Sequence, residues 1–233
     1  MKIALLGYGR MGQEIEKIAV SRGHEIVVKS DIKGFTDEQI QNADVAIDFS
    51  VPESAVSNIK QSIKNNVPVV VGTTGWLDQY NEVADYCKEQ NGGFIYASNF
   101  SLGVNIFFEL NNKLAEMLSG HEQYAVEMEE IHHTKKLDAP SGTAITLAEG
   151  IIENSKFAGW KLDNAEENEI AITAKRIGNI PGTHTVKYTS AIDDIEIKHT
   201  AHNRKGFALG AVVAAEWLTD KHGVYTMKDV LGL

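Results

Sequence analysis

The first hundred residues alternate short apolar runs with amphipathic segments, and no other feature of the sequence constrains the fold as strongly. The segments between the runs repeat their apolar residues at helical spacing. The five apolar runs cover residues 2–7, 24–31, 43–50, 67–75 and 94–101. Such an alternation predicts right-handed βαβ units, in which helices cover a parallel sheet.

The second half of the chain changes to longer strand-like runs. They cover residues 124–134, 169–178, 182–190 and 194–201. Several of them alternate apolar and polar residues, which predicts antiparallel strands with one solvated face. Helices are predicted at residues 103–120, 141–154 and 206–220. The change of pattern places a domain boundary near Ser101.

The turn after the first predicted strand carries Gly7, Gly9 and Gly12 in a G-x-G-x-x-G pattern. In a dinucleotide-binding turn the first glycine permits the tight turn and the second lets the backbone approach a pyrophosphate. The third lets the helix pack against the strand. The free N–H groups of the helix then face the phosphates. The pattern predicts dinucleotide binding, with an ordinary tight turn as the alternative.

Asp31 lies at the predicted end of the second strand, where an acid would bind a ribose hydroxyl. It favours NAD, whereas Lys33 and Arg10 are near enough in sequence to offer charge to the 2′-phosphate of NADP. A plain turn residue is the alternative interpretation of Asp31. Residues 71–75 and 97–101 follow the fourth and fifth strands. Because open α/β sheets bind ligands at this edge, these loops predict a cofactor cleft.

Two histidines and two lysines lie close together in residues 132–136. If the strand continues through them, His132, Thr134 and Lys136 share one face, and His133 and Lys135 the other. A histidine can donate a proton near neutral pH, and a lysine can stabilise an anionic substrate. We predict a catalytic segment rather than a polar strand. Adjacent histidines face opposite ways, so no metal site is predicted.

Ser141 is predicted to be the N-cap of the helix that follows. The N–H groups of Gly142 and Thr143 would then form an anion site at the start of that helix. The other histidines of the second half are predicted to be surface or interface residues: His184, His199 and His202.

Composition excludes several classes of protein. The chain has a formal net charge of −10, and its basic segments at residues 132–136 and 199–205 are short. They suit a small anion better than a nucleic acid. No apolar run approaches the roughly 20 residues that span a bilayer, and the glycine-punctuated start is unlike a signal peptide. With Cys87 as the only cysteine, we predict a cytoplasmic protein without membrane or nucleic-acid partners.

The segment EEIHHTKKLDAPSGTA, residues 129–144, resembles the signature E-x-H-H-x-x-K-x-D-A-P-S-G-T of the 4-hydroxy-tetrahydrodipicolinate reductase (dihydrodipicolinate reductase) family. The resemblance continues at GYGRMG, DFS, GTTG, SNFSLGVN and HTAHNRKGFALGAVVAAEWL, so it covers nearly the whole chain. It implies reduction of (hydroxy)tetrahydrodipicolinate to tetrahydrodipicolinate by NADH or NADPH, with loss of water, in lysine and diaminopimelate biosynthesis.

The family resemblance also implies a domain organisation and an assembly. It implies an α/β protein whose Rossmann-like dinucleotide-binding domain has a parallel sheet, at residues 1–101 and 205–233. Residues 102–204 would form an α+β domain that binds a small dicarboxylate and assembles the homotetramer.

The same resemblance assigns roles to single residues. His132 matches the proposed proton donor and Lys136 its partner, whereas Lys135 does not match. The substrate contacts would be His133, Ser141, Gly142, Thr143 and Arg204. The cofactor contacts would be Gly7, Tyr8, Gly9, Arg10, Met11, Gly12, Asp31, Gly72, Thr73, Thr74, Ala97, Ser98, Asn99 and Phe100.

The chain departs from the family pattern in two places. Its glycine loop is shorter than the common G-x-G-G-R-M-G, and Asp31-Ile32-Lys33 replaces an acid–arginine pair, so the choice between NADH and NADPH stays open. Two alternatives remain. Another two-domain NAD(P)-dependent amino-acid dehydrogenase would not explain the Asp-Ala-Pro-Ser-Gly-Thr run, and a non-catalytic NAD(P)H-binding redox sensor would not need His132 and Lys136.

Overall fold

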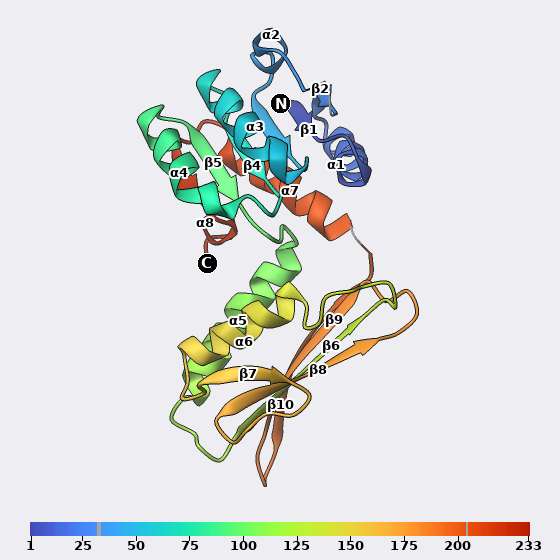
Figure 1. Ribbon diagram of the computed structural model, residues 1–233, viewed down its shortest axis with the longest axis vertical. Coiled ribbons are helices and arrows are strands. Elements are labelled where there is room, and N and C mark those ends of the chain that lie inside the picture. The colour runs from blue at the N-terminus through green and yellow to red at the C-terminus, as the bar shows by residue number, and fades with distance from the viewer. Residues whose placement is uncertain (32–33, 204) are drawn as a thin grey trace. The chain divides into compact units, whose positions relative to one another are not determined.

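The computed structural model describes residues 1–31, 34–203 and 205–233, so Lys33 and Arg204 lie outside the described residues. The chain divides into two compact units (Figure 1). The first comprises Met1–Leu102 and Lys205–Leu233, and the second Gly103–Arg204. Within the described ranges, no helix is both long and apolar enough to cross a membrane.

The first unit is built on a six-stranded sheet with the order β11-β5-β4-β3-β1-β2. Every strand pairing in it is parallel. The strands are β1 (Lys2–Leu6), β2 (Glu25–Ser30), β3 (Val45–Asp48), β4 (Val69–Val71), β5 (Gly93–Tyr96) and β11 (Gly223–Tyr225). The helices are α1 (Arg10–Ser21), α2 (Asp37–Ile40), α3 (Pro52–Lys64), η1 (Leu77–Gln79), α4 (Tyr80–Glu89), α7 (Lys205–Leu218) and α8 (Met227–Leu231). The predicted Rossmann-like parallel sheet is confirmed.

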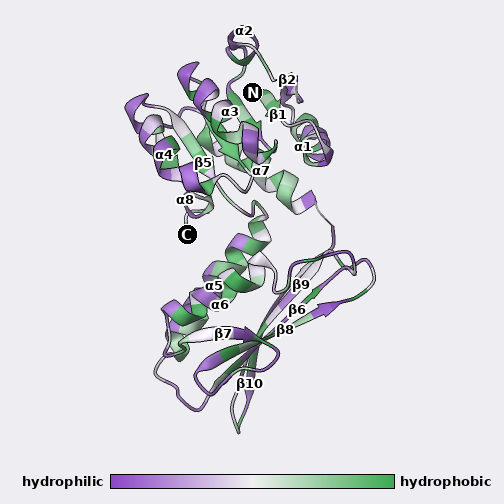
Figure 2. Cartoon of the chain, in the orientation of Figure 1, coloured by the Kyte–Doolittle hydropathy of each residue, from purple (hydrophilic) through white to green (hydrophobic). Residues whose placement is uncertain are grey.

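Both faces of this sheet are buried, and the sequence of β1 shows why. Ile3 and Leu5 join the core formed with α1, α7 and α8, whereas Ala4 and Leu6 join the core formed with α2, α3 and α4. A strand covered on both sides is apolar at every position. Figure 2 shows hydrophobic colour over much of the middle of the sheet and hydrophilic colour on the edge strand β2. Polar residues of the sheet therefore gather at the strand ends.

The second unit has a mixed five-stranded sheet with the order β10-β9-β6-β8-β7. Its elements are α5 (Leu102–Leu118), β6 (Ala125–His132), α6 (Gly142–Glu153), β7 (Gly159–Leu162), β8 (Glu169–Arg176), β9 (Gly182–Thr189) and β10 (Asp194–Ala201). Strand β9 is antiparallel to β6 and β10, but β8 is parallel to β6 and β7. The prediction of an antiparallel arrangement is therefore wrong for β8, because alternation reports which face is buried and not the strand direction.

Strand β6 leads from the core of the second unit into a polar cluster. Val126 and Met128 pack with residues of α5 and α6 in the core. Glu130 and His132 continue the same buried side of the strand, because alternate residues of a strand point the same way. The hydrophobic face of β6 thus fixes where these two polar side chains lie.

Candidate active site

A cavity of about 550 Å³ lies at the carboxyl edge of the parallel sheet. Ligand sites in proteins typically measure roughly 300–1,000 Å³. The cavity is lined by Gly7, Tyr8, Gly9, Asp31, Gly34, Phe35, Phe49, Ser50, Val51, Ser54, Ser57, Asn58 and Gln61. Four predicted cofactor residues, Gly7, Tyr8, Gly9 and Asp31, are among them.

The three glycines of the loop have different surroundings. Gly7 has a φ of +93°, and a Cβ there would lie 2.3 Å from the carbonyl oxygen of Phe49. A Cβ on Gly12 would lie 2.5 Å from the carbonyl oxygen of Gly7. Around Gly9, the N-cap of α1, no described atom lies within 4 Å of such a Cβ. This geometry fits a tight turn, an open approach to the free N–H groups of α1 and close helix packing, as pyrophosphate binding requires.

Alanine at Gly7 and at Gly9 should have different effects. We expect Gly7→Ala to lower the free energy of unfolding by about 1–3 kcal/mol, since the methyl group meets the backbone at a positive φ. Gly9→Ala is the matched control, because its φ is −83° and the space is open. It should change stability by less than about 0.5 kcal/mol but weaken the binding of NADH or NADPH. Thermal unfolding and NADH titration measure the two effects, and a Gly7→Ala protein of wild-type stability would contradict this account.

The remaining predicted cofactor residues also lie near this edge of the sheet. Arg10 is exposed at the start of α1, and Met11 packs against the core. Gly72 directly follows β4, and the exposed Thr74 lies two residues further on. Residues that follow β5 complete the set: Ala97, Ser98, Asn99 and Phe100. Of these four, Phe100 is buried, and its side chain packs in the hydrophobic core of the first unit.

The Thr73 hydroxyl is held inside the protein. It donates a hydrogen bond of 2.5 Å to Oδ1 of Asp48 and accepts one of 2.8 Å from the Ser50 N–H. Asn58 donates to the other Asp48 oxygen at 2.8 Å. Burial raises the pKa of the Asp48 carboxyl, and these hydrogen bonds partly offset the rise. Asp48 therefore ties the ends of β3 and β4 to α3 beneath the cavity, a role that the sequence analysis did not assign.

Phe49 and one face of α3 were also missed. The Phe49 ring occupies the space in which a Gly72 side chain would stand, since a Cβ there would lie 2.2 Å from it. Its centroid lies 5.8 Å from that of Phe100. The α3 residues that line the cavity are Ser54, Ser57, Asn58 and Gln61. Their i, i+3, i+4, i+7 spacing marks one polar helix face, and this signal was available in the sequence.

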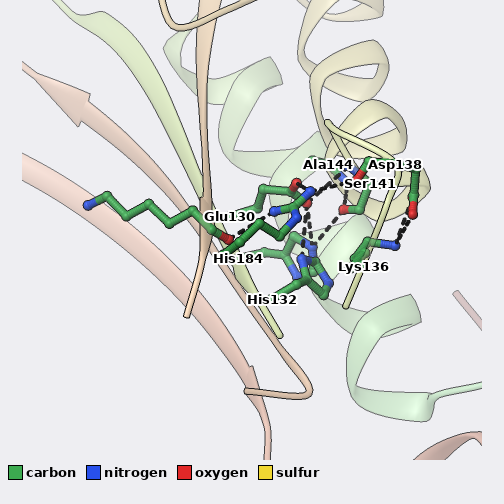
Figure 3. Close-up of polar contacts among 9 residues, drawn as sticks. Glu130, His132, Lys136, Asp138, Ser141, Ala144 and His184 are labelled. Atoms are coloured by element: carbon green, nitrogen blue, oxygen red, sulfur yellow. Dashed lines mark hydrogen bonds and ion pairs between the residues drawn. The ribbon is translucent and has the colours of Figure 1, made fainter. Parts of the chain in front are cut away.

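In the second unit, the buried Glu130, His132, Ser141 and His184 and the half-buried Arg176 form a polar cluster. Figure 3 labels the four buried members. Glu130 accepts hydrogen bonds from Arg176 Nη2 at 2.9 Å and from the Ser141 N–H at 3.1 Å. His132 Nδ1 lies 3.3 Å and His184 Nε2 lies 3.7 Å from the same carboxylate oxygen, Oε2. The Ser141 hydroxyl and His184 Nε2 are 3.1 Å apart.

Strand register brings this cluster together. Glu130 on β6 lies directly opposite His184 on β9, and His132 on β6 lies beside Arg176 on β8. Residues that face each other across a strand pair lie on the same side of the sheet. The prediction that His184 is a surface or interface residue is therefore wrong, because its side chain is only 5% exposed.

The charges in the cluster are fixed by burial and contact. Burial alone raises the pKa of the Glu130 carboxyl. The contacts with His132, His184, Ser141 and Arg176 lower this pKa more strongly, to well below its usual range, so Glu130 is ionised. Burial also lowers the pKa of His184, which keeps this ring neutral at neutral pH. The cluster thus pairs the buried Glu130 carboxylate with the half-buried Arg176 guanidinium.

Glu130, His132 and His184 each offer a potential metal ligand, and these atoms lie within 4.8 Å of one another. The sequence analysis considered only the adjacent pair His132 and His133. It did not predict this grouping, because His184 belongs to a different strand, β9. Both carboxylate oxygens of Glu130 already accept hydrogen bonds, one of them from the Arg176 guanidinium. A divalent cation would meet that positive charge at short range, so we interpret the cluster as a hydrogen-bonded network.

Lys136 does not lie on the strand. Strand β6 ends at His132, and the Lys136 N–H donates to the His133 carbonyl at 3.0 Å, which closes a turn. The predicted common strand face of His132, Thr134 and Lys136 is therefore wrong. The turn forms because the chain leaves the sheet at this point to reach α6. Lys136 Nζ instead donates to both oxygens of Asp138, at 2.7 and 2.9 Å.

The start of α6 lies directly beside the cluster. Ser141 is the N-cap, as predicted, and its hydroxyl accepts a hydrogen bond from the Ala144 N–H at 3.3 Å. Gly142 is exposed and Thr143 is half-buried, and first-turn N–H groups have no partner within a helix. His133 is half-buried next to His132. A positively polarised helix end thus adjoins a buried histidine, which suits an anionic substrate that is to be protonated.

The parallel-sheet unit with its glycine loop, followed by a mixed-sheet unit with this cluster, defines an NAD(P)-dependent two-domain reductase. Residues 1–100 match the family model described as "Dihydrodipicolinate reductase, N-terminus", and residues 103–231 match "Dihydrodipicolinate reductase, C-terminus". The chain therefore belongs to the dihydrodipicolinate reductase family, and the predicted family and enzyme class are confirmed.

Individual relatives agree with this family. The chain is 62% identical over 239 residues to the 4-hydroxy-tetrahydrodipicolinate reductase of Christiangramia forsetii. The match covers 99% of this chain and 98% of the relative. The enzyme of the same name from Methanoregula boonei is 35% identical over 255 residues, covering 100% and 98%. The dipicolinate-bound dihydrodipicolinate reductase from Paenisporosarcina sp. TG-14 shares the fold, with a TM-score of 0.78 over 97% of both chains at 23% identity.

Proposed function

We propose that this chain reduces 4-hydroxy-tetrahydrodipicolinate to tetrahydrodipicolinate with NADH or NADPH and releases water, as a step of lysine and diaminopimelate biosynthesis. The observation that carries the proposal is the buried His132–Glu130 pair next to the first turn of α6. The histidine can donate the proton that the reduction requires, and the helix start can bind the carboxylates of the substrate. The identity to named reductases over the whole chain supports the same substrate.

The first unit would hold the cofactor, which supplies a hydride when bound. Gly7 forms the turn, Gly9 gives the pyrophosphate access to the N–H groups of α1, and Gly12 lets α1 pack closely. Asp31, at the end of β2, would accept a hydrogen bond from a ribose hydroxyl. Tyr8 lines the same cavity.

The second unit would hold the substrate and manage the proton. His132 holds the proton that passes to the ring carbon next to the carbon that receives the hydride. Lys136 and the N–H groups of Gly142 and Thr143 bind the carboxylates, with further contacts proposed for His133, Ser141 and Arg204. Before these two transfers, the hydroxyl group and one hydrogen of the neighbouring ring carbon leave together as water. The C=C bond left between the two carbons then takes the hydride on one carbon and the His132 proton on the other. Local positive groups are necessary here because the chain as a whole carries a net charge of −10.

The decisive experiment follows NADH and NADPH oxidation with enzymatically generated substrate. We expect turnover that depends on the substrate with at least one cofactor. A redox sensor would bind NAD(P)H without oxidising it, and an amino-acid dehydrogenase would instead turn over with an amino acid. Either result would contradict the proposal. We further propose a homotetramer, which predicts a mass in solution of four times 25.6 kDa.

Asp31 should set the cofactor preference. We expect Asp31→Ser to lower kcat/KM for NADH about 10- to 100-fold, the effect of losing a hydrogen bond to a charged group. NADPH should lose less, because the carboxylate that repels a 2′-phosphate is gone. Steady-state kinetics with both cofactors measures the change. Asp44→Asn removes one negative charge at an exposed residue just before β3 and is the control for net charge. If Asp31→Ser lowers kcat/KM equally for NADH and NADPH, the proposed role of Asp31 is contradicted.

A further inference from the structure

One fully buried carboxylate touches both parts of the proposed substrate site. Glu130 has no exposed surface. Its Oε2 accepts the N–H of Ser141, the N-cap of α6, and lies 3.3 Å from His132 Nδ1. Its Oε1 accepts Arg176 Nη2, which also donates to the carbonyl of Asp138 at 2.5 Å. The proton donor, the helix start and the Lys136–Asp138 turn thus share this one group.

The two nitrogens of the His132 ring have different surroundings. Nδ1 faces Glu130 but, among the described residues, has no partner aligned for a hydrogen bond. Nε2 lies next to Gly182, where a side chain would start 3.1 Å from it. The glycine therefore leaves space at Nε2. A buried carboxylate that contacts one ring nitrogen fixes the tautomer and stabilises the protonated ring.

We propose that Glu130 is a positioning residue for the reduction. It keeps the proton on Nδ1 of His132, so that Nε2 is the atom that delivers a proton to the substrate. Through the Ser141 N–H, it also fixes the first turn of α6 relative to that ring. This inference rests on the proposed function, which assigns proton transfer to His132.

The other charged groups near His132 do not replace Glu130. His184 on β9 stays neutral because burial lowers its pKa, and His199 on β10 lies opposite His184 rather than opposite His132. Arg176 on β8 and Lys136 in the turn are cations, and neither can accept a hydrogen bond from a ring N–H. The carboxylate of Asp138, in the turn that follows β6, is paired with Lys136 Nζ. Glu130 is thus the carboxylate in contact with the His132 ring.

The test replaces Glu130 with glutamine, which keeps the shape of the side chain and removes its charge. We expect kcat to fall about 10- to 100-fold, with an unchanged KM for the cofactor. Glu129→Gln is the matched control. Glu129 is the preceding residue of β6, its side chain points to the opposite face of the sheet, and it pairs with Lys175 of β8. A wild-type kcat in Glu130→Gln would overturn the proposal.

The double variant Glu130→Gln/His132→Gln separates positioning from a general structural effect. If Glu130 acts through His132, kcat of the double variant should equal that of His132→Gln alone. A further 10- to 100-fold loss would show that Glu130 acts independently and would overturn the proposal. Circular dichroism of each variant verifies that it is folded.

A second measurement needs no variant and no turnover. Nitrogen-15 NMR of the imidazole groups in the wild-type protein reports which ring nitrogen carries the proton. We expect the neutral form of His132 to be protonated at Nδ1, and protonation at Nε2 would overturn the proposal even if Glu130→Gln does not fold. A failure of the proposed function looks different. The wild-type protein would then not oxidise NADH or NADPH with the substrate, whatever the state of the His132 ring.

Discussion

Replacing His132 with glutamine is expected to lower kcat about 10²- to 10⁴-fold, the usual contribution of a general acid. Glutamine can fill the space and form a hydrogen bond, but it cannot carry the proton that the substrate carbon requires. The affinity for NADH should stay nearly unchanged, because the residues that line the cofactor cavity all belong to the first unit. Steady-state kinetics and NADH titration measure the two quantities separately.

The control for this variant is His121→Gln, which makes the same chemical change at an exposed histidine of the second unit. It should leave kcat and the affinity for NADH at wild-type values. Normal turnover in His132→Gln would remove His132 from the reaction. A loss of NADH binding comparable to the loss of kcat would show that the substitution disturbs more than proton transfer.

Features that depend on neighbouring residues could be predicted from the sequence. The turn at Gly7, the helix that starts at Arg10 and the cap at Ser141 each depend on a few adjacent positions, and all three are present. The parallel sheet of the first unit followed from the alternation of strands and helices. Such local signals act through backbone geometry and helix ends, which do not depend on distant parts of the chain.

The network around Glu130 could not be predicted in this way. Arg176 is 46 positions from Glu130, and His184 is 43 positions from Ser141. Their meeting depends on how β6 pairs with β8 and β9, and a shift of one residue would turn every side chain to the other face. Alternation in the sequence specifies neither the register nor the direction of β8.

Replacing Lys136 with alanine is expected to lower kcat/KM for the substrate about 10- to 100-fold, mainly through KM. The hydrogen bond of a charged group contributes roughly 1.5–3 kcal/mol, and about 1.4 kcal/mol corresponds to a factor of ten. Lys136 also neutralises Asp138, because its hydrogen bond holds the pKa of that carboxyl below the usual value. The single variant therefore removes a positive charge and exposes a negative one, and both changes repel a dicarboxylate.

The double variant Lys136→Ala/Asp138→Ala separates these two effects. Removing Asp138 as well should restore part of the lost kcat/KM, and the part that stays lost measures the contact of Lys136 with the substrate. Lys135→Ala, a change at the exposed neighbour, is the matched control and should keep wild-type kinetics. If the double variant recovers fully, Lys136 serves only to neutralise Asp138. If Lys136→Ala has wild-type kcat/KM, the turn after His132 does not bind the substrate, and the carboxylates depend on the first turn of α6.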